Sequence, residues 1–293
     1  MAYQSGRVKH RATAREFRVV NPDCSACRVL KDTRSGAGFS ASFWMLSLED
    51  MNKLSIIVFI FVSLGSLQHV FSQDFNRPHN SDYPKLPKSG KSINDFVPKD
   101  WETVGKAQGD LNGDKLEDCA LVIKANLSKF LNKHDGLGSN PFDTNPRILV
   151  ILFKDKDGYK IAKQSNTFIV APDSPTQLEP FQEVRIKNGI LELSFELFSS
   201  AGSWSMTSSS YRFKFLNGEF VLIGADKTDS MRNSGEMTSR SYNFLTSRLK
   251  VSTGNFSSDR QKIRWRTYKL RKLKTLDTFK APFSWKIEPD YYL

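Results

Sequence analysis

Alternating hydrophobic and polar residues over short stretches are the main structural pattern in the second half of this chain. Such stretches lie at 183–187, 190–198, 211–215 and 220–223. Alternation with a period of two is typical of a β-strand that buries one face. A continuous apolar run from Arg147 to Phe153 instead indicates a strand that is buried on both faces. We find no convincing helical stripe after residue 72, so the pattern predicts a mainly β domain.

Two Asn-Gly pairs, Asn188-Gly189 and Asn217-Gly218, stand between alternating stretches. Asn-Gly is typical of a two-residue hairpin turn, because both central residues need positive φ angles. Asp157-Gly158 marks a third turn after the apolar run. The turn glycines lie 31 and 29 residues apart, and a recurring hairpin is also typical of propeller blades. We therefore predict antiparallel hairpins that form a twisted sheet, a sandwich or a partial propeller-like domain.

The sequence upstream of this domain predicts a signal peptide at residues 51–72. Lys53 precedes an apolar run from Leu54 to Leu64, and small residues follow, which is the order of a secretory signal. We place the cleavage site between Ser72 and Gln73. A retained membrane anchor stays an alternative, although a spanning helix needs about 20 apolar residues and this run is shorter. A buried helix is the third reading.

The predicted signal divides the rest of the chain. Residues 1–50 are basic and lack a clear apolar period, so we interpret them as a non-native upstream extension or a disordered tail. Residues 73–90 are rich in Pro and Ser, which predicts a flexible leader. Residues 91–293 then form a single β-rich domain. Export would place the mature protein in the periplasm or outside the cell, with no transmembrane segment after signal removal.

The net positive charge of the chain indicates which class of partner it attracts. The chain carries 43 basic and 31 acidic residues, a net charge of +12. Nine basic and five acidic residues lie before residue 73, which leaves +8 on the mature part. A positive protein attracts polyanions. For an exported protein we expect an acidic polysaccharide or an anionic envelope surface as the partner, in preference to nucleic acid.

Cysteine and histidine offer little chemistry. Cys24 and Cys27 form a Cys-x-x-Cys pair, without the second pair that a zinc site would need. Cys119 is alone after residue 72 and lies in an apolar run, which predicts a buried, inert thiol. His79 and His134 are the only histidines there, so Ser-His and zinc-His sites are poorly supplied. The sequence therefore favours a binding role, and a hydrolase with a carboxylate pair stays an alternative.

The stretch Asp110–Asp118 reads Asp-Leu-Asn-Gly-Asp-Lys-Leu-Glu-Asp. Oxygen-bearing side chains stand at positions one, three, five and nine, a spacing with which a loop folds around a calcium ion. An apolar strand, 119–123, follows directly. The alternative is an ordinary polar turn, because Asp, Asn and Gly are common in turns for local reasons.

This stretch resembles the calcium loop of FG-GAP/VCBS repeats, and the segment 211–243 is similar to exported bacterial proteins that carry one such loop. The resemblance implies export, a β fold and one calcium ion, and implies no activity. Lys115 stands where the family has Gly at a tight turn, so we expect weaker calcium binding. The ligands that the resemblance implies are the side chains of Asp110, Asn112, Asp114 and Asp118 and the backbone carbonyl of Leu116.

A basic stretch from Arg260 to Lys274 is the second candidate site. If it is a strand, its basic residues share one face, and Ile263, Trp265 and Thr267 share the other, which we expect to face the core. The stretch predicts either an ordinary solvated basic face or a polyanion-binding site. The candidate polyanion-binding residues are Lys262, Arg264, Arg266, Lys269, Arg271 and Lys272.

Overall fold

The computed structural model describes residues 74–268 and 270–293, all within one compact unit, Phe71–Leu293. The predictions for residues 1–72, among them the signal peptide and the Cys24–Cys27 pair, lie outside the described residues. Strands dominate the described part, and the prediction of a mainly β fold is confirmed. Its helices are three short 3-10 turns: η1 (Asn80–Asp82), η2 (Ile93–Phe96) and η3 (Ser128–Phe130).

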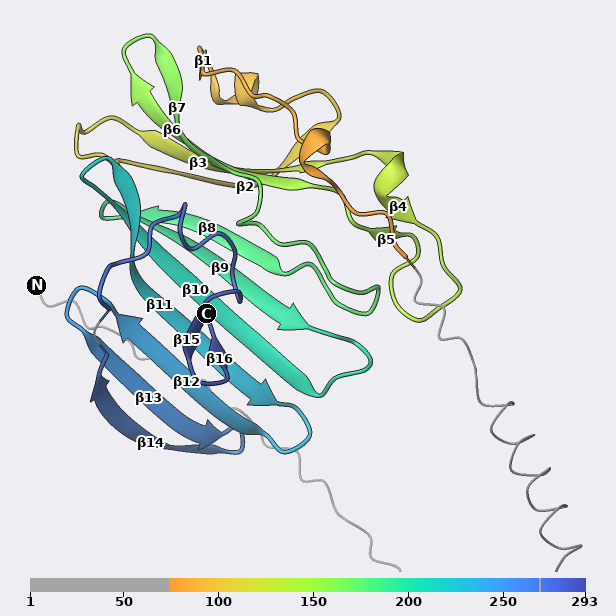
Figure 1. Cartoon of the computed structure of the whole chain (residues 1–293), viewed down its shortest axis with the longest axis vertical. Helices are drawn as coiled ribbons and strands as arrows, with labels where there is room; N and C mark the ends of the chain where they lie inside the picture. The colour runs from red at the N-terminus through yellow and green to blue at the C-terminus, as the bar shows by residue number, and fades with distance from the viewer. Residues whose placement is uncertain (1–73, 269) are drawn as a thin grey trace, which may run out of the picture. The chain divides into compact units, whose positions relative to one another are not determined.

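A five-stranded antiparallel sheet has the order β1–β7–β6–β3–β2 (Figure 1). The apolar run predicted as a doubly buried strand is β6, and the strand after the Asp110–Asp118 loop is β3. Both have their central side chains buried on the two faces. The strands are β1 (Ser89–Gly90), β2 (Trp101–Gly109), β3 (Asp118–Ala125), β6 (Arg147–Asp155) and β7 (Gly158–Ser165).

A seven-stranded antiparallel sheet follows in the chain, with the order β14–β13–β12–β11–β10–β9–β8. Neighbouring strands are consecutive in sequence, as expected for a chain of hairpins. The strands are β8 (Phe181–Lys187), β9 (Ile190–Phe198), β10 (Ser205–Leu216), β11 (Glu219–Met231), β12 (Glu236–Asn243), β13 (Arg248–Asn255) and β14 (Ser258–Thr267). Two small sheets pair β4 (Leu131–Asn132) with β5 (Phe142–Asp143), and β15 (Lys286–Glu288) with β16 (Tyr291–Tyr292).

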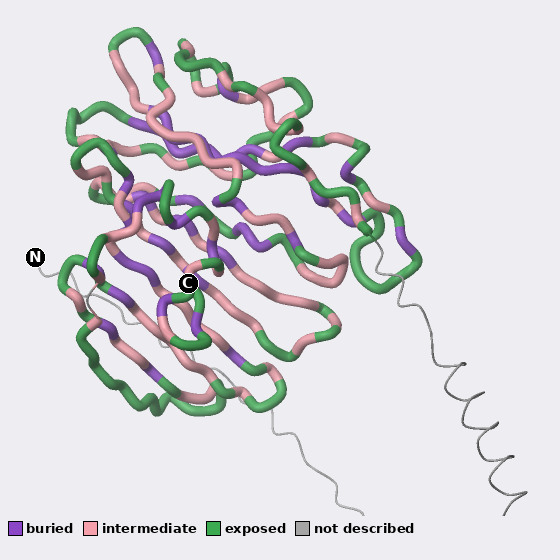
Figure 2. Tube along the Cα trace, in the orientation of Figure 1, coloured by how far each residue is buried: buried purple, intermediate pink, exposed green. Residues whose placement is uncertain are grey.

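One hydrophobic core joins the two large sheets. Val122 of β3 and Ile151 of β6 share it with Leu193 of β9 and Tyr211 of β10, which are all buried. Residues after β14, including Phe279 and Leu293, close the same core. Of the predicted architectures, the packed open sheets therefore form a sandwich, and Figure 2 shows the buried positions gathered between them.

The other face of the five-stranded sheet has its own apolar layer. Cys119, Leu121 and Val150 point into it, and Phe96 of η2 covers them. The burial of Cys119 raises the pKa of its thiol to about 11, which suits the inert role predicted from the sequence. Since β3 and β6 are covered on both sides, their continuous apolar composition has a direct physical cause.

The segment predicted as a flexible leader, 73–90, needs correction for the residues that the structure describes. The backbone N–H of Asn76 donates to Asn132 Oδ1 at 2.7 Å, and β1 pairs with β7. Tyr83 and Leu86 pack against the layer under Phe96. Proline and serine suggested flexibility, but these two apolar side chains and the exposed edge of β7 tie the segment to the domain.

The hairpin turns match their sequence signal. Asn188 and Gly189 have φ angles of 53° and 71°, and Asn217 and Gly218 have 51° and 83°. At the third turn Gly158 is the first residue of β7, with a φ of +146°. A Cβ atom there would lie 2.2 Å from the carbonyl oxygen of Gly90. Gly158 is therefore required by the close approach of β1.

We predict that Gly158→Ala destabilises the domain by more than about 2 kcal/mol, because the new methyl group forces β1 away from β7. Gly218→Ala is the matched control, since it has a positive φ but nothing within 4 Å of a new Cβ. That control should cost only about 1 kcal/mol of backbone strain. Urea unfolding measures both free energies, and equal losses would contradict the steric explanation.

Candidate functional site

The Asp110–Asp118 loop connects β2 to β3 and folds around its own side chains. Asp110 accepts the backbone N–H groups of Gly113 at 2.6 Å and Lys115 at 2.9 Å. Asp114 accepts the N–H of Leu116 at 2.8 Å and the Asn112 side-chain amide at 3.0 Å. The side chains of Asp110, Asn112 and Asp114 thus lie around one tight turn.

Lys115 holds the backbone geometry that the loop demands. Its φ is +69°, in the left-handed region that a glycine would occupy at little cost. A lysine in this conformation carries a strain of roughly 1 kcal/mol. Lys115 therefore adds strain to the turn that a glycine would avoid.

Asp118 has a different environment from the other acids of the loop. It is fully buried, and its carboxylate accepts the N–H groups of Leu111 and Lys154, each at 2.9 Å. Burial raises the pKa of this carboxyl, while the two N–H groups act against that shift. Both oxygens of Asp118 have backbone partners, so this residue ties the loop to β6.

The loop reaches the second sheet through an Asn-Gly turn. Residues of both line a cavity of about 490 Å³, namely Asp110, Asn112, Asn188 and Gly189, together with Lys214. Across the described ranges, no three Asp, Glu, His or Cys side chains gather closely enough to hold a metal ion. Calcium also accepts amide and backbone oxygens, so the donors present at the turn are the carboxylates of Asp110 and Asp114 and the Asn112 amide.

Leu116, the fifth predicted ligand, uses its carbonyl within the loop. The carbonyl oxygen accepts the backbone N–H of Asp118 at 3.2 Å. A carbonyl oxygen has a second lone pair, which can still face a cation. Asp110, Asn112 and Asp114 therefore make their hydrogen bonds within the turn. Asp118 and the carbonyl of Leu116 accept backbone N–H groups.

The basic stretch forms β14, the last strand of the seven-stranded sheet, and all ten residues of this strand are exposed. Figure 2 shows it as a continuous exposed edge. Arg264 is opposite Val251 and Arg266 is opposite Leu249. Opposed residues share a face of the sheet, and Leu249 belongs to the core. The basic residues therefore lie on the inner face, which is the face that carries the core.

The prediction that Ile263 and Trp265 face the core is wrong. They lie on the opposite, outer face and are 51% and 59% exposed. Arg248 of β13 places its guanidinium 4.9 Å from the centre of the Trp265 ring, a cation–π contact on the same outer face. Alternation correctly separated the residues of β14 into two faces. The core does not extend as far as β14, so the face that continues the inner side of the sheet has no need of apolar residues.

The structure brings together three of the six predicted polyanion-binding residues. Lys262, Arg264 and Arg266 alternate along the inner face of β14. Lys269 lies outside the described residues. Arg271 and Lys272 are exposed in the segment after the strand. That segment turns away from β14, because Thr275 bridges to Val221 of β11.

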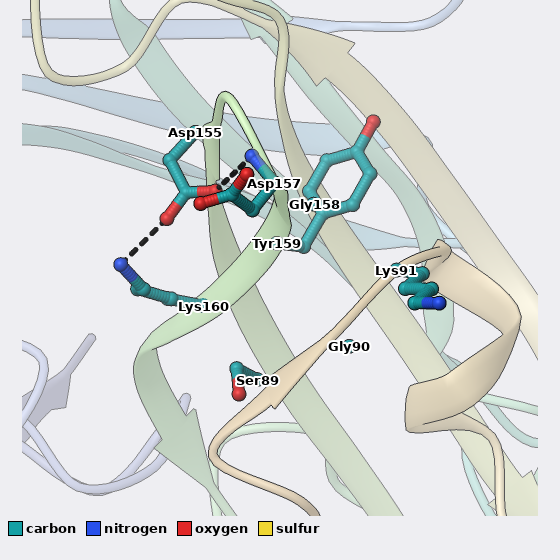
Figure 3. Close-up of a pocket in the computed structure, with 8 residues that line it drawn as sticks. All are labelled: Ser89, Gly90, Lys91, Asp155, Asp157, Gly158, Tyr159 and Lys160. Carbon is teal, nitrogen blue, oxygen red and sulfur yellow. Dashed lines mark hydrogen bonds and ion pairs between the residues drawn. The ribbon is translucent and has the colours of Figure 1, made fainter.

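Two acidic residues at the β6–β7 turn, Asp155 and Asp157, line a surface depression. This depression of about 300 Å³ is lined by Asp155, Asp157, Tyr159 and Lys160, among others (Figure 3). Asp155 contacts Lys160 Nζ at 2.6 Å, and this partner holds the pKa of Asp155 below its usual value. A general acid requires a raised pKa, so Asp155 does not suit that role.

A buried arginine is the polar feature that the sequence reading missed. Arg147 opens β6, is 3% exposed, and contacts Glu179 through Nη2. It lines a cavity of about 230 Å³ with Lys124 and Phe181. Its position before an apolar run was the available signal, since such a cation must find a partner when the strand is buried.

Lys124 also has acidic partners, which limits the charge of this cavity. Its Nζ lies 3.1 Å from Asp143 and 3.5 Å from Glu102. Burial raises the pKa of Asp143, but hydrogen bonds from Asn145 and Lys124 outweigh it and hold the pKa below its usual value. Both cations at the cavity are therefore compensated.

Comparisons with known proteins give no relative for this chain: no family model, curated protein or solved structure matches it. Within residues 74–268 and 270–293, the helices are too short and too polar to cross a membrane.

We predict that Asp143→Asn lowers stability more at pH 7 than at pH 3. A depressed pKa means that the folded state favours the ionised carboxyl, so its contribution exists above the unfolded pKa and is lost as the pH falls through the folded value. The test is urea unfolding of both proteins at the two pH values. Asp135→Asn, an exposed change in the segment between β4 and β5, is the control. An equal loss at both pH values would refute the assignment.

Proposed function

We propose that this chain is an exported β-sandwich binding module that recognises a polyanionic ligand at β14. The supporting observation is the inner face of this edge strand, where Lys262, Arg264 and Arg266 are exposed together. The ion pairs of the described residues use other cations, such as Arg185 and Arg212. The three cations of β14 are therefore available to a partner.

Electrostatics favours an extended ligand over a compact one. Successive basic side chains on one face of a strand repeat about every 6.8 Å, twice the rise per residue. A row of charges along one line fits a linear polyanion, and each contact releases counterions from it. Binding should therefore weaken steeply as salt is added.

The β14 site is tested by the triple change Lys262→Glu, Arg264→Glu and Arg266→Glu. We expect the affinity for heparin and for polygalacturonate to fall by roughly tenfold or more at about 0.15 M salt, since three contacts are reversed. Affinity chromatography and calorimetry measure it. The matched control reverses three exposed lysines far from β14 in sequence, Lys85, Lys88 and Lys99. An equal loss of affinity in both triple variants would show that binding depends on the net charge of the protein and not on a site at β14.

We also propose a structural calcium ion in the Asp110–Asp118 loop. The turn formed by Asp110, Asn112 and Asp114 supports it, because it places two carboxylates on one short hydrogen-bonded turn. Their repulsion would be relieved by a cation. Since the loop lies beside the Asn188–Gly189 turn of the second sheet, bound calcium would stabilise the junction of the two sheets and raise the stability of the folded state.

The calcium proposal predicts that millimolar calcium raises the midpoint of thermal unfolding relative to chelator. In Asp114→Ala the rise should disappear, because one carboxylate of the turn is lost. Asp157→Ala removes an exposed acid from another hairpin turn and should keep the full response. Differential scanning calorimetry measures the midpoints. An unchanged midpoint in wild-type protein would leave the loop as a hydrogen-bonded polar turn.

A further inference from the structure

The backbone of β14 presents a regular pattern of hydrogen-bonding groups at the free edge of the sheet. The N–H of Tyr268, just after β14, donates at 2.9 Å to the carbonyl of Ser247, the residue before β13. Backbone direction alternates along an antiparallel strand. Counting back in register, Arg266, Arg264 and Lys262 also direct their N–H and C=O groups toward β13.

The residues between them direct their backbone groups away from the sheet. Thr267, Trp265 and Ile263 occupy these alternate positions, opposite Arg248, Lys250 and Ser252. β14 is the terminal strand in the order of its sheet. Among the residues that the structure describes, no strand pairs with its other edge, so its outward N–H and C=O groups form an open template for a further strand.

Charge decides which strand can use this template. A second copy of β14 would bring Lys and Arg side chains opposite one another, and like charges directly opposed destabilise a strand pair. An added strand with Asp or Glu at alternate positions has the complementary charge. In such a pair the basic residues occupy non-hydrogen-bonded positions, where Cα atoms are only about 4.5 Å apart and side chains are closest.

We propose that β14 binds an extended acidic peptide segment of another protein, which adds to the sheet as an antiparallel eighth strand. This inference rests on the proposed recognition of polyanions at β14, and it specifies that the polyanion is a peptide. An added strand repeats at the same spacing as β14, so each acidic side chain meets one basic side chain. An acidic polysaccharide supplies charge but has no row of peptide groups to pair with the outward backbone.

The outer face adds a second requirement on the partner. Ile263 and Trp265 are exposed there, and residues directly opposite them would lie on the same face. Apolar residues at those positions would remove both side chains from water. The partner sequence therefore alternates acidic and apolar residues, and this alternation distinguishes it from a uniform run of Glu or Asp.

The test uses the full chain and a synthetic ten-residue peptide that alternates Glu and Val. A second peptide has the same sequence, with N-methyl groups on alternate residues along one edge; a third carries them along the other. N-methylation removes backbone donors without changing charge. We expect one methylated peptide to bind roughly tenfold or more weakly than the parent, because several backbone bonds are lost. Calorimetry gives the affinities.

Two variants of the protein separate backbone pairing from charge. Ile263→Pro removes one outward N–H and keeps every basic residue, so it should weaken the peptide and leave polygalacturonate binding unchanged. Ile263→Ala is its control, because it loses the side chain but keeps the N–H. The proline variant should therefore bind the peptide more weakly than the alanine variant. Circular dichroism checks the fold of both. Should the proline variant not fold, the methylated peptides still decide the question.

The outcomes distinguish this inference from the function on which it rests. Equal binding of all three peptides, or binding of polygalacturonate alone, would overturn strand addition and leave polyanion recognition at β14 standing. Failure of every probe would overturn both. Tight binding of the parent peptide, weakened by methylation along one edge and by the triple Glu change, would support both.

Discussion

The burial of β3 and β6 on both faces is the constraint on which the rest of the structure depends. Their apolar side chains point alternately to two sides, so two separate layers must cover them. Residues of the segment around Phe96 form one layer, and the seven-stranded sheet forms the other. The covering sheet has two strands more than the sheet it covers. The segment after β14 closes the core over Tyr242 of β12 and Leu249 of β13, whereas every residue of β14, the last strand of the wider sheet, stays exposed.

The parts of the fold that could be predicted from the sequence are those that depend on neighbouring residues. Local chemistry determined the turns, because Asn217 and Gly218 adopt positive φ angles for reasons contained in two residues. The apolar run at β6 indicated double burial for a similar reason. The orientation of Trp265 could not be predicted, since alternation separates two faces without showing which of them another layer covers. That information depends on contacts between residues far apart in the chain.

The candidate sites show the same division between local and distant information. The turn through Asp110, Asn112 and Asp114 follows from local spacing, and the structure places those side chains around one loop. Asp118 matched the same spacing, but its carboxylate serves two backbone groups, one of them on Lys154 of β6. The spacing of residues within the loop gives no information about a contact with β6, which is distant in the sequence. The segment 74–90 was misjudged for a related reason, because its composition describes a free peptide and its position depends on the open edge of β7.

Charge on β14 has two physical effects that follow from one arrangement. Edge strands are a hazard because their free backbone groups accept any strand, and basic residues reduce that hazard by opposing self-association. The same row of charges does not repel every strand, since it attracts one that is acidic at the matching positions. The same charges therefore disfavour pairing with a second copy of β14 and favour pairing with an acidic strand, and specificity is the difference between these two interaction energies. Neither effect requires a pocket, and both depend on Lys262, Arg264 and Arg266 sharing one face, which the register with β13 determines.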